Sequence, residues 1–288
     1  MQDTPQAEYL AMSGSKQSNI VVSTSPRLSL DHMLLEVPDI VMTMDQPSVT
    51  YLLEYLKTLP NIFLQTGGTI FMHPRLHPNG LPPSLAMMFS LCAIHSHASP
   101  QNQHIVWEAI SNTTVKLLRL GSSLPTFISK LEFVQSLILL QIITLFDPRT
   151  PLHLIQLAEN RQGLLESAEL DLFNSVPAYL PSLMDPYQAW ILAESCRRTI
   201  HAAHMVLGLY SMLSQGTFVL TLFVEALPLH RDSTLWETEE VFDNEEGEDL
   251  KMIVTTREKN LMSYRELTDL WDAGGIKKLG PFEKLLVV

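Results

Sequence analysis

The stretch from Asp185 to Gln215, DPYQAWILAESCRRTIHAAHMVLGLYSMLSQ, constrains the fold more than any other part of the chain. Asp185 is a good N-terminal cap, Pro186 suits the first helical turn, and Gly216 follows the last residue of the segment. Its apolar residues recur at helical spacing: Trp190, Ile191, Ala193, Cys196, Ile200, Ala203, Val206, Leu207 and Tyr210. The sequence therefore predicts one long, largely buried helix.

A charged cluster lies inside this apolar stripe. Glu194 precedes Arg197 and Arg198 by three and four residues, so its carboxylate can pair with either guanidinium on one helix face. The first interpretation is an ion pair that fixes packing. The second is an anion site for a ligand or for a partner's acidic surface, a role that arginine forks suit. Because nothing nearby in the sequence completes a pocket, we favour the ion pair.

The composition favours helices throughout. The 288 residues are 46% hydrophobic and 17% charged, and only 12 are glycine. A chain of this length can fill a substantial core, and strand-like alternation of apolar and polar residues is rare in it. We expect an all-α fold, a multi-helix bundle with an irregular C-terminal extension.

The charge and the cysteines exclude several classes of function. The net charge of −12 repels phosphate backbones and the sequence has no dense basic patch, so direct nucleic-acid binding is not expected. Cys92 and Cys196 lie in separate apolar patterns, as small buried residues do in a reducing compartment. Two thiolates cannot form a metal cage of four. We expect neither a metal nor a cofactor.

Four segments are predicted along the chain. Residues 1–44 are Ser-rich and turn-prone and are expected to be a disordered or loosely docked tail without a signal peptide. Residues 45–235 form the helical domain, in which the longest apolar run is too short for a membrane span. Residues 236–250 are an acidic linker, read either as a solvated loop or as an activation segment. Residues 251–288 carry a short helix that packs on the domain.

Prolines and glycines set the remaining expected elements. The predicted helices span Asp45–Leu59, ended by Pro60, then Pro83–His97, Pro100–Gly121, Pro125–Phe146, a single helix from Pro151 to about Leu172, and Ser263–Ala273. The segment Phe218–Ala226 is either a helix or a buried extended piece, and residues beyond Ile276 are expected to be a tail.

No catalytic motif stands out in the sequence. GxSxG, GxGxxG, GxxxxGK[ST], HExxH and paired CxxC are all absent. His73 and His77 are four residues apart, but each precedes a proline, so a regular helix presenting both to one metal is not expected. We therefore predict that the chain is not an enzyme.

Six stretches carry a resemblance to a known family. They are FMHPRLH (Phe71–His77), KLEFVQSLILLQIITLFD (Lys130–Asp147), LIQLAENRQGLLESAELDLF (Leu154–Phe173), YQAWILAESCRRTIHAAHMVLGLYSML (Tyr187–Leu213), ALPLHRDSTLWE (Ala226–Glu237) and YRELTDLW (Tyr264–Trp271). Together they resemble the regulatory, non-DNA-binding region of fungal zinc binuclear cluster transcription factors, particularly those of secondary-metabolite gene clusters.

This resemblance implies an all-helical regulatory domain that binds effectors or partners. The family's DNA-binding module uses six cysteines around two zinc ions, whereas this sequence has no cysteine before Cys92. We therefore expect a nuclear transcription regulator without its own DNA-binding domain. Its expected partner is a full-length factor or a second copy of the chain, with a small-molecule effector as a further ligand class and no membrane contact. The residues expected to serve structure or partner binding are Trp190, Glu194, Arg197, Arg198, Trp236 and Trp271.

Two alternatives stay open at this point. The same helical scaffold could hold an apolar metabolite, as a small-molecule-binding protein or an enzyme of the same pathway, because bundle cavities accept such ligands. The chain could also be a zinc cluster factor whose cysteine module was lost by truncation.

Overall fold

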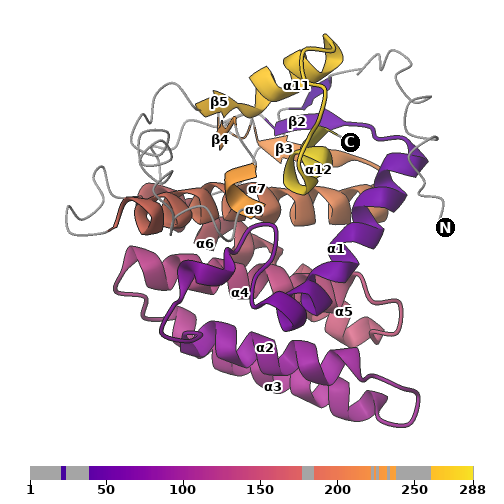
Figure 1. The fold of residues 1–288 in the computed structure, drawn as a ribbon. Coiled ribbons are helices and arrows are strands. Elements are labelled where there is room, and N and C mark those ends of the chain that lie inside the picture. Colours follow the sequence, from indigo (N-terminus) through magenta and orange to yellow (C-terminus); the bar gives the residue numbers. More distant parts are fainter. Residues whose placement is uncertain are drawn as a thin grey trace, which may run out of the picture.

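Helix α4 (Phe127–Leu145) lies at the centre of the molecule (Figure 1). The computed structural model describes residues 21–23, 39–176, 185–221, 224, 227–231, 234–237 and 261–287. Most of α4 is buried, and it contacts α1, α2, α3, α5, α6 and α7. Its length and composition alone would suffice to cross a membrane, but 72% of its most apolar window is buried inside the protein. The all-α, multi-helix fold that the sequence predicted is confirmed.

Helix α7 (Pro186–Gln215) is the long helix predicted from the sequence. The Asp185 side chain accepts hydrogen bonds from the amides of Tyr187 and Gln188, and Gly216 ends the helix in the left-handed conformation that glycine adopts freely. One side of α7 packs on α4, and its other side carries the strands and the C-terminal helices (Figure 1). This helix therefore joins the helical body to the remaining elements.

Helix α1 (Gln46–Thr66) is longer than predicted, because Pro60 lies inside it and does not end it. A proline in a helix interior removes one backbone hydrogen bond and crowds the preceding turn. Continuing the helix, however, buries Leu59, Pro60 and Phe63 in the core. The burial of these side chains offsets the lost hydrogen bond.

The helix predicted from Pro151 to Leu172 is in fact two helices, α5 (Leu152–Glu159) and α6 (Gln162–Asn174). Asn160 ends the first helix and Arg161 begins the second. The break lets both helices contact α4, through buried residues such as Leu154 and Leu165. Helices α2 (Pro83–Ser96) and α3 (Gln103–Gly121) pack on the other side of α4 (Figure 1).

Short antiparallel strands lie beside α7. Strand β2 (Asp39–Met42) pairs with β1 (Val21–Ser23) on one side and with β3 (Phe218–Thr221) on the other. The segment 218–226, left open as helix or extended, therefore begins as a strand. The second sheet pairs β4 (Pro228–His230) with β5 (Leu261–Ser263).

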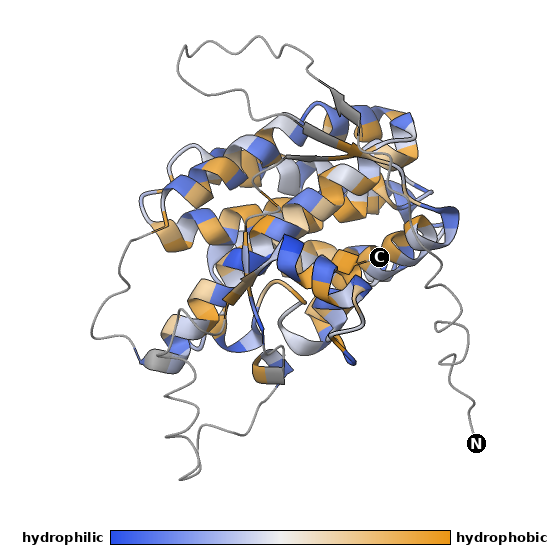
Figure 2. Ribbon diagram, turned by 90° about the horizontal axis from the view of Figure 1, so that it is seen from above, coloured by the Kyte–Doolittle hydropathy of each residue, from blue (hydrophilic) through white to orange (hydrophobic). Residues whose placement is uncertain are grey.

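The C-terminal region folds into helices on α7. Helix α11 (Tyr264–Asp272) begins at the cap Ser263, as predicted. The prediction of a tail beyond Ile276 was wrong, because helix α12 (Pro281–Val287) buries Phe282, Glu283, Leu285 and Leu286. Figure 2 shows hydrophobic residues gathered where the central helices lie against one another. The core that they form includes residues of α12.

Candidate functional site

Arg198, in the middle of α7, is the centre of a buried polar cluster. Its side chain is only 3% exposed. Its Nε donates to Glu194 Oε1 at 2.9 Å, one terminal nitrogen donates to the carbonyl of Ile70 at 3.3 Å, and the other donates to Glu283 Oε1 at 3.4 Å. One guanidinium thus ties α7 to the loop after α1 and to α12.

Glu194 is shared by two arginines. Besides the Arg198 bond, its Oε2 accepts from Arg197 Nε at 2.9 Å. Burial alone would raise the pKa of Glu194, but the two neighbouring guanidinium groups outweigh it and hold that pKa at about 2. The carboxylate is therefore ionised at neutral pH. The predicted pairing is present with both arginines, and Arg197 stays partly exposed.

A carbonyl in the loop after α1 collects two more hydrogen bonds. The Thr199 hydroxyl donates to the carbonyl of Phe71 at 3.2 Å, and the Gln135 amide nitrogen donates to the same oxygen at 3.4 Å. The loop turns sharply there: a side chain at Gly68 would come within 2.6 Å of the Met72 carbonyl. The loop is thereby fixed against both α4 and α7.

Aromatic rings cover the guanidinium. The Arg198 Cζ atom lies 4.2 Å from the ring centroid of Trp236 in α9 (Thr234–Glu237) and 4.7 Å from that of Phe282 in α12. Trp236 in turn packs edge-on to His73, with ring centroids 4.9 Å apart, and contacts Trp190. Such cation–π contacts stabilise a cation that is out of reach of water.

Five of the six residues predicted from the sequence therefore meet at one place, while Trp271 lies elsewhere. The five are Trp190, Glu194, Arg197, Arg198 and Trp236. Trp271 is on α11, where it is 38% exposed. The predicted acidic linker 236–250 falls, beyond Glu237, outside the described residues.

Sequence reasoning missed the partners that come from distant segments. Glu283 and Phe282 follow Arg198 by more than 80 positions, and the carbonyl of Ile70 precedes it by 128. The sequence argued against a metal site at His73 but did not predict its contact: its Nδ1 accepts from the Arg75 amide and caps the short helix η2 (Pro74–Leu76). Burial, then the positive charges of Arg75 and Arg198, lower the pKa of His73 to about 4.

The chemistry of this cluster is structural: its charged groups hold segments of the fold together. The carboxylate and the guanidinium groups are paired with each other, and burial raises the pKa of the nearby Cys196 thiol to about 12. Within the described ranges, no three His, Cys, Asp or Glu side chains come together as a metal site would need. The cluster therefore fixes the positions of the loop after α1, α9 and α12 on α7.

One relative gives this fold a functional context. The chain is similar to a fungal transcription factor. That relative, transcription factor gsfR2 of Penicillium aethiopicum, is 33% identical over 190 residues, which are 60% of this chain and 45% of the relative. The chain thus spans less than half the length of the relative it matches. No family model matches the chain, and no solved structure matches it.

Proposed function

We propose that this chain is a nuclear transcription regulator that acts through a protein partner and does not contact DNA itself. The observation that carries the proposal is the similarity to a fungal transcription factor over 190 residues. The net charge of −12 supports the absence of direct DNA contact, because an acidic protein is repelled by DNA phosphates. The resemblance to the regulatory region of zinc cluster factors supports control of a secondary-metabolite gene cluster.

Helix α11 offers a surface for the partner. Leu267 is the buried residue of this helix. Leu270 and Trp271 are 37% and 38% exposed, next to Asp269 and Asp272. An exposed tryptophan beside acidic groups suits a partner that presents an apolar pocket with basic residues around it. We assign this surface to a transcription factor that has its own DNA-binding domain.

A tethering assay tests the proposal. The whole chain, fused to an unrelated DNA-binding domain, is expected to change transcription of a reporter that carries the matching DNA site. The substitution Trp271→Ala should weaken the effect severalfold, while Phe173→Ala, which truncates a similarly exposed aromatic residue of α6, should leave it unchanged. A reporter that does not respond to the tethered chain would contradict the regulatory role.

A specific observation favours a second candidate function, the binding of a small molecule. The structure contains a cavity beside α7, separate from the Arg198 cluster, whose walls are largely apolar. Apolar walls with few polar groups are typical of ligand sites.

A further inference from the structure

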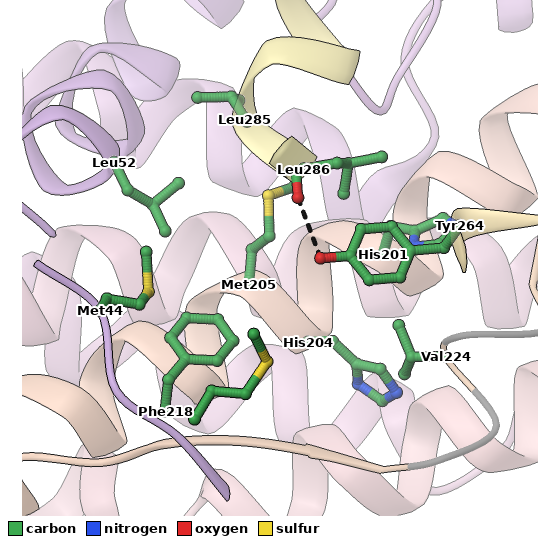
Figure 3. A pocket seen from close by; sticks show the side chains of 11 residues that line it. Met44, Leu52, His201, His204, Met205, Phe218, Val224, Tyr264, Leu285 and Leu286 are labelled. Carbon is green, nitrogen blue, oxygen red and sulfur yellow. Dashed lines mark hydrogen bonds between the residues drawn. The ribbon is translucent and has the colours of Figure 1, made fainter. Parts of the chain in front are cut away.

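The cavity beside α7 measures about 70 Å³ and is partly open to solvent. Figure 3 shows the side chains that line it. Three methionines line it, Met42 and Met44 at the end of β2 and Met205 on α7, together with Phe218 of β3. Leu285 and Leu286 of α12 close another side. Segments from the N-terminal, middle and C-terminal parts of the chain thus build one largely apolar cavity.

A buried histidine on its wall has no hydrogen-bond partner among the described residues. His201 is 1% exposed, and neither of its ring nitrogens makes a hydrogen bond. Burial lowers the pKa of His201 to about 3, so the ring is neutral at neutral pH and has one N–H donor and one acceptor nitrogen. Buried polar groups of native proteins are almost always hydrogen-bonded, so this ring calls for a partner that the described residues do not supply.

The other polar groups on the wall are already engaged. His204 Nδ1 lies 3.0 Å from a carboxylate oxygen of Glu169. The Tyr264 hydroxyl donates to the carbonyl of Leu286 at 3.0 Å, as the dashed line in Figure 3 shows. A molecule in the cavity would therefore meet one polar group in need of a partner, His201, and apolar surface elsewhere.

The size and lining of the cavity limit what can enter. An ordered water needs two to four polar partners, and the largely apolar walls offer few. A cavity of roughly 150 Å³ holds benzene, about twice the volume found here. Methionine side chains are flexible and polarizable, so Met42, Met44 and Met205 can move to admit a single ring.

We propose that this cavity binds a small neutral molecule consisting of one apolar ring with a hydroxyl group, and that the hydroxyl pairs with the imidazole of His201. The hydroxyl can both donate to and accept from a neutral imidazole, while the ring fills the space between the methionines. Binding itself is independent of the function proposed above. The further step, that such a ligand is the effector of a regulator, rests on that function.

Phenol and toluene are the matched probes for this proposal, since they are nearly equal in size and differ by the hydroxyl. The whole protein, labelled with carbon-13 at its methionine methyl groups, is titrated with each probe and followed by nuclear magnetic resonance. Phenol is expected to shift the signals of Met42, Met44 and Met205 in a saturable way. Met72 and Met88, which are buried elsewhere, should not respond. Phenol should bind severalfold more tightly than toluene, as a net hydrogen bond of about 1 kcal/mol implies.

Two variants test separately the hydrogen bond to His201 and the space in the cavity. His201→Leu should remove the preference for phenol over toluene, whereas His153→Leu, an exposed histidine on α5, should keep it. A methyl group added at Gly208 would lie 2.4 Å from the Phe218 ring and push that ring aside. Because the cavity is the open space next to Phe218, Gly208→Ala should weaken both probes severalfold.

Four results would overturn the proposal: no saturable binding of phenol, equal affinities for the two probes in the wild-type protein, phenol shifts at Met72 or Met88 but not at the cavity methionines, or a phenol preference that survives in His201→Leu. The wild-type titration decides the first three even if a variant fails to fold. Absence of binding leaves the tethered-reporter result untouched, so failure of this site and failure of the regulatory role can be told apart.

Discussion

Arg198 is the residue on which three segments depend. Replacing it with methionine should destabilise the protein by about 3 to 5 kcal/mol, because Glu194 keeps its charge in a buried place with Arg197 as its remaining partner. Chemical denaturation of Arg198→Met measures this, with Arg119→Met, at an exposed position of α3, as the control. Equal stabilities of the two variants would contradict the role of Arg198.

The pair Glu194 and Arg198 should also be coupled energetically. The double variant Glu194→Gln/Arg198→Met should cost less than the sum of the two single changes by about 1 kcal/mol or more, because the cost of leaving Glu194 with one guanidinium fewer disappears when Glu194 is neutral as well. A double-mutant cycle in denaturant measures the coupling. Additive effects would show that the two side chains do not stabilise each other.

His201 should make the protein sensitive to acid. Its pKa is about 3 in the folded chain and about 6.5 when unfolded, so the unfolded state takes up the proton first as the pH falls below 6.5. Between pH 7.5 and 5.0 the wild type should lose roughly 2 kcal/mol more stability than His201→Leu. Measuring the free energy of unfolding of both proteins at the two pH values tests this. Because the change between the two pH values is compared across the proteins, the contributions of the other titrating groups cancel. Parallel losses in both proteins would contradict a neutral, buried His201.

At the scale of elements, α12 should be an integral part of the fold. Phe282 is 1% exposed and lies against Arg198, so Phe282→Ala should cost about 3 to 5 kcal/mol. Lys284 is exposed on the same helix, and Lys284→Ala should change stability by less than about 0.5 kcal/mol. Thermal unfolding of both variants tests this. A Phe282→Ala protein as stable as the wild type would mean that α12 is dispensable.

The elements that the sequence predicted are those with local signals. Helix α7 has its cap at Asp185 and its stop at Gly216, and both residues act within one turn of the helix end. Helix α12 was missed because seven residues are too few for a periodic pattern, and its burial comes from contacts with distant segments. The extension of α1 beyond Pro60 likewise depends on tertiary packing, which outweighs the local preference of proline.

In the site, too, contacts within one helix were predictable and contacts between distant segments were not. The pairing of Glu194 with both arginines follows from their spacing on one helix and was predictable. Glu283, Phe282 and the carbonyl of Ile70 reach Arg198 only because the chain folds back, so a single sequence gives no signal for them. The unpartnered His201 was equally hidden, because its sequence position shows only a histidine on an apolar helix.

For the whole molecule, the described structure joins a helical body to a C-terminal region. Arg198 holds this region in place through its contacts with Phe282 and Glu283. Trp271, the exposed aromatic residue of α11, lies on that C-terminal region and is our proposed contact for a partner. A regulator built in this way would transmit partner binding through the contacts of α11, α12 and α7.

The most direct test of the account is to delete the gene and measure, in the same cultures, the transcripts of the neighbouring genes and the metabolite profile. We predict that transcripts and metabolite change together, and that the wild-type gene restores both while a Trp271→Ala copy does not. If the transcripts stay level while a pathway intermediate accumulates, the protein is an enzyme or a carrier and the regulatory account is wrong.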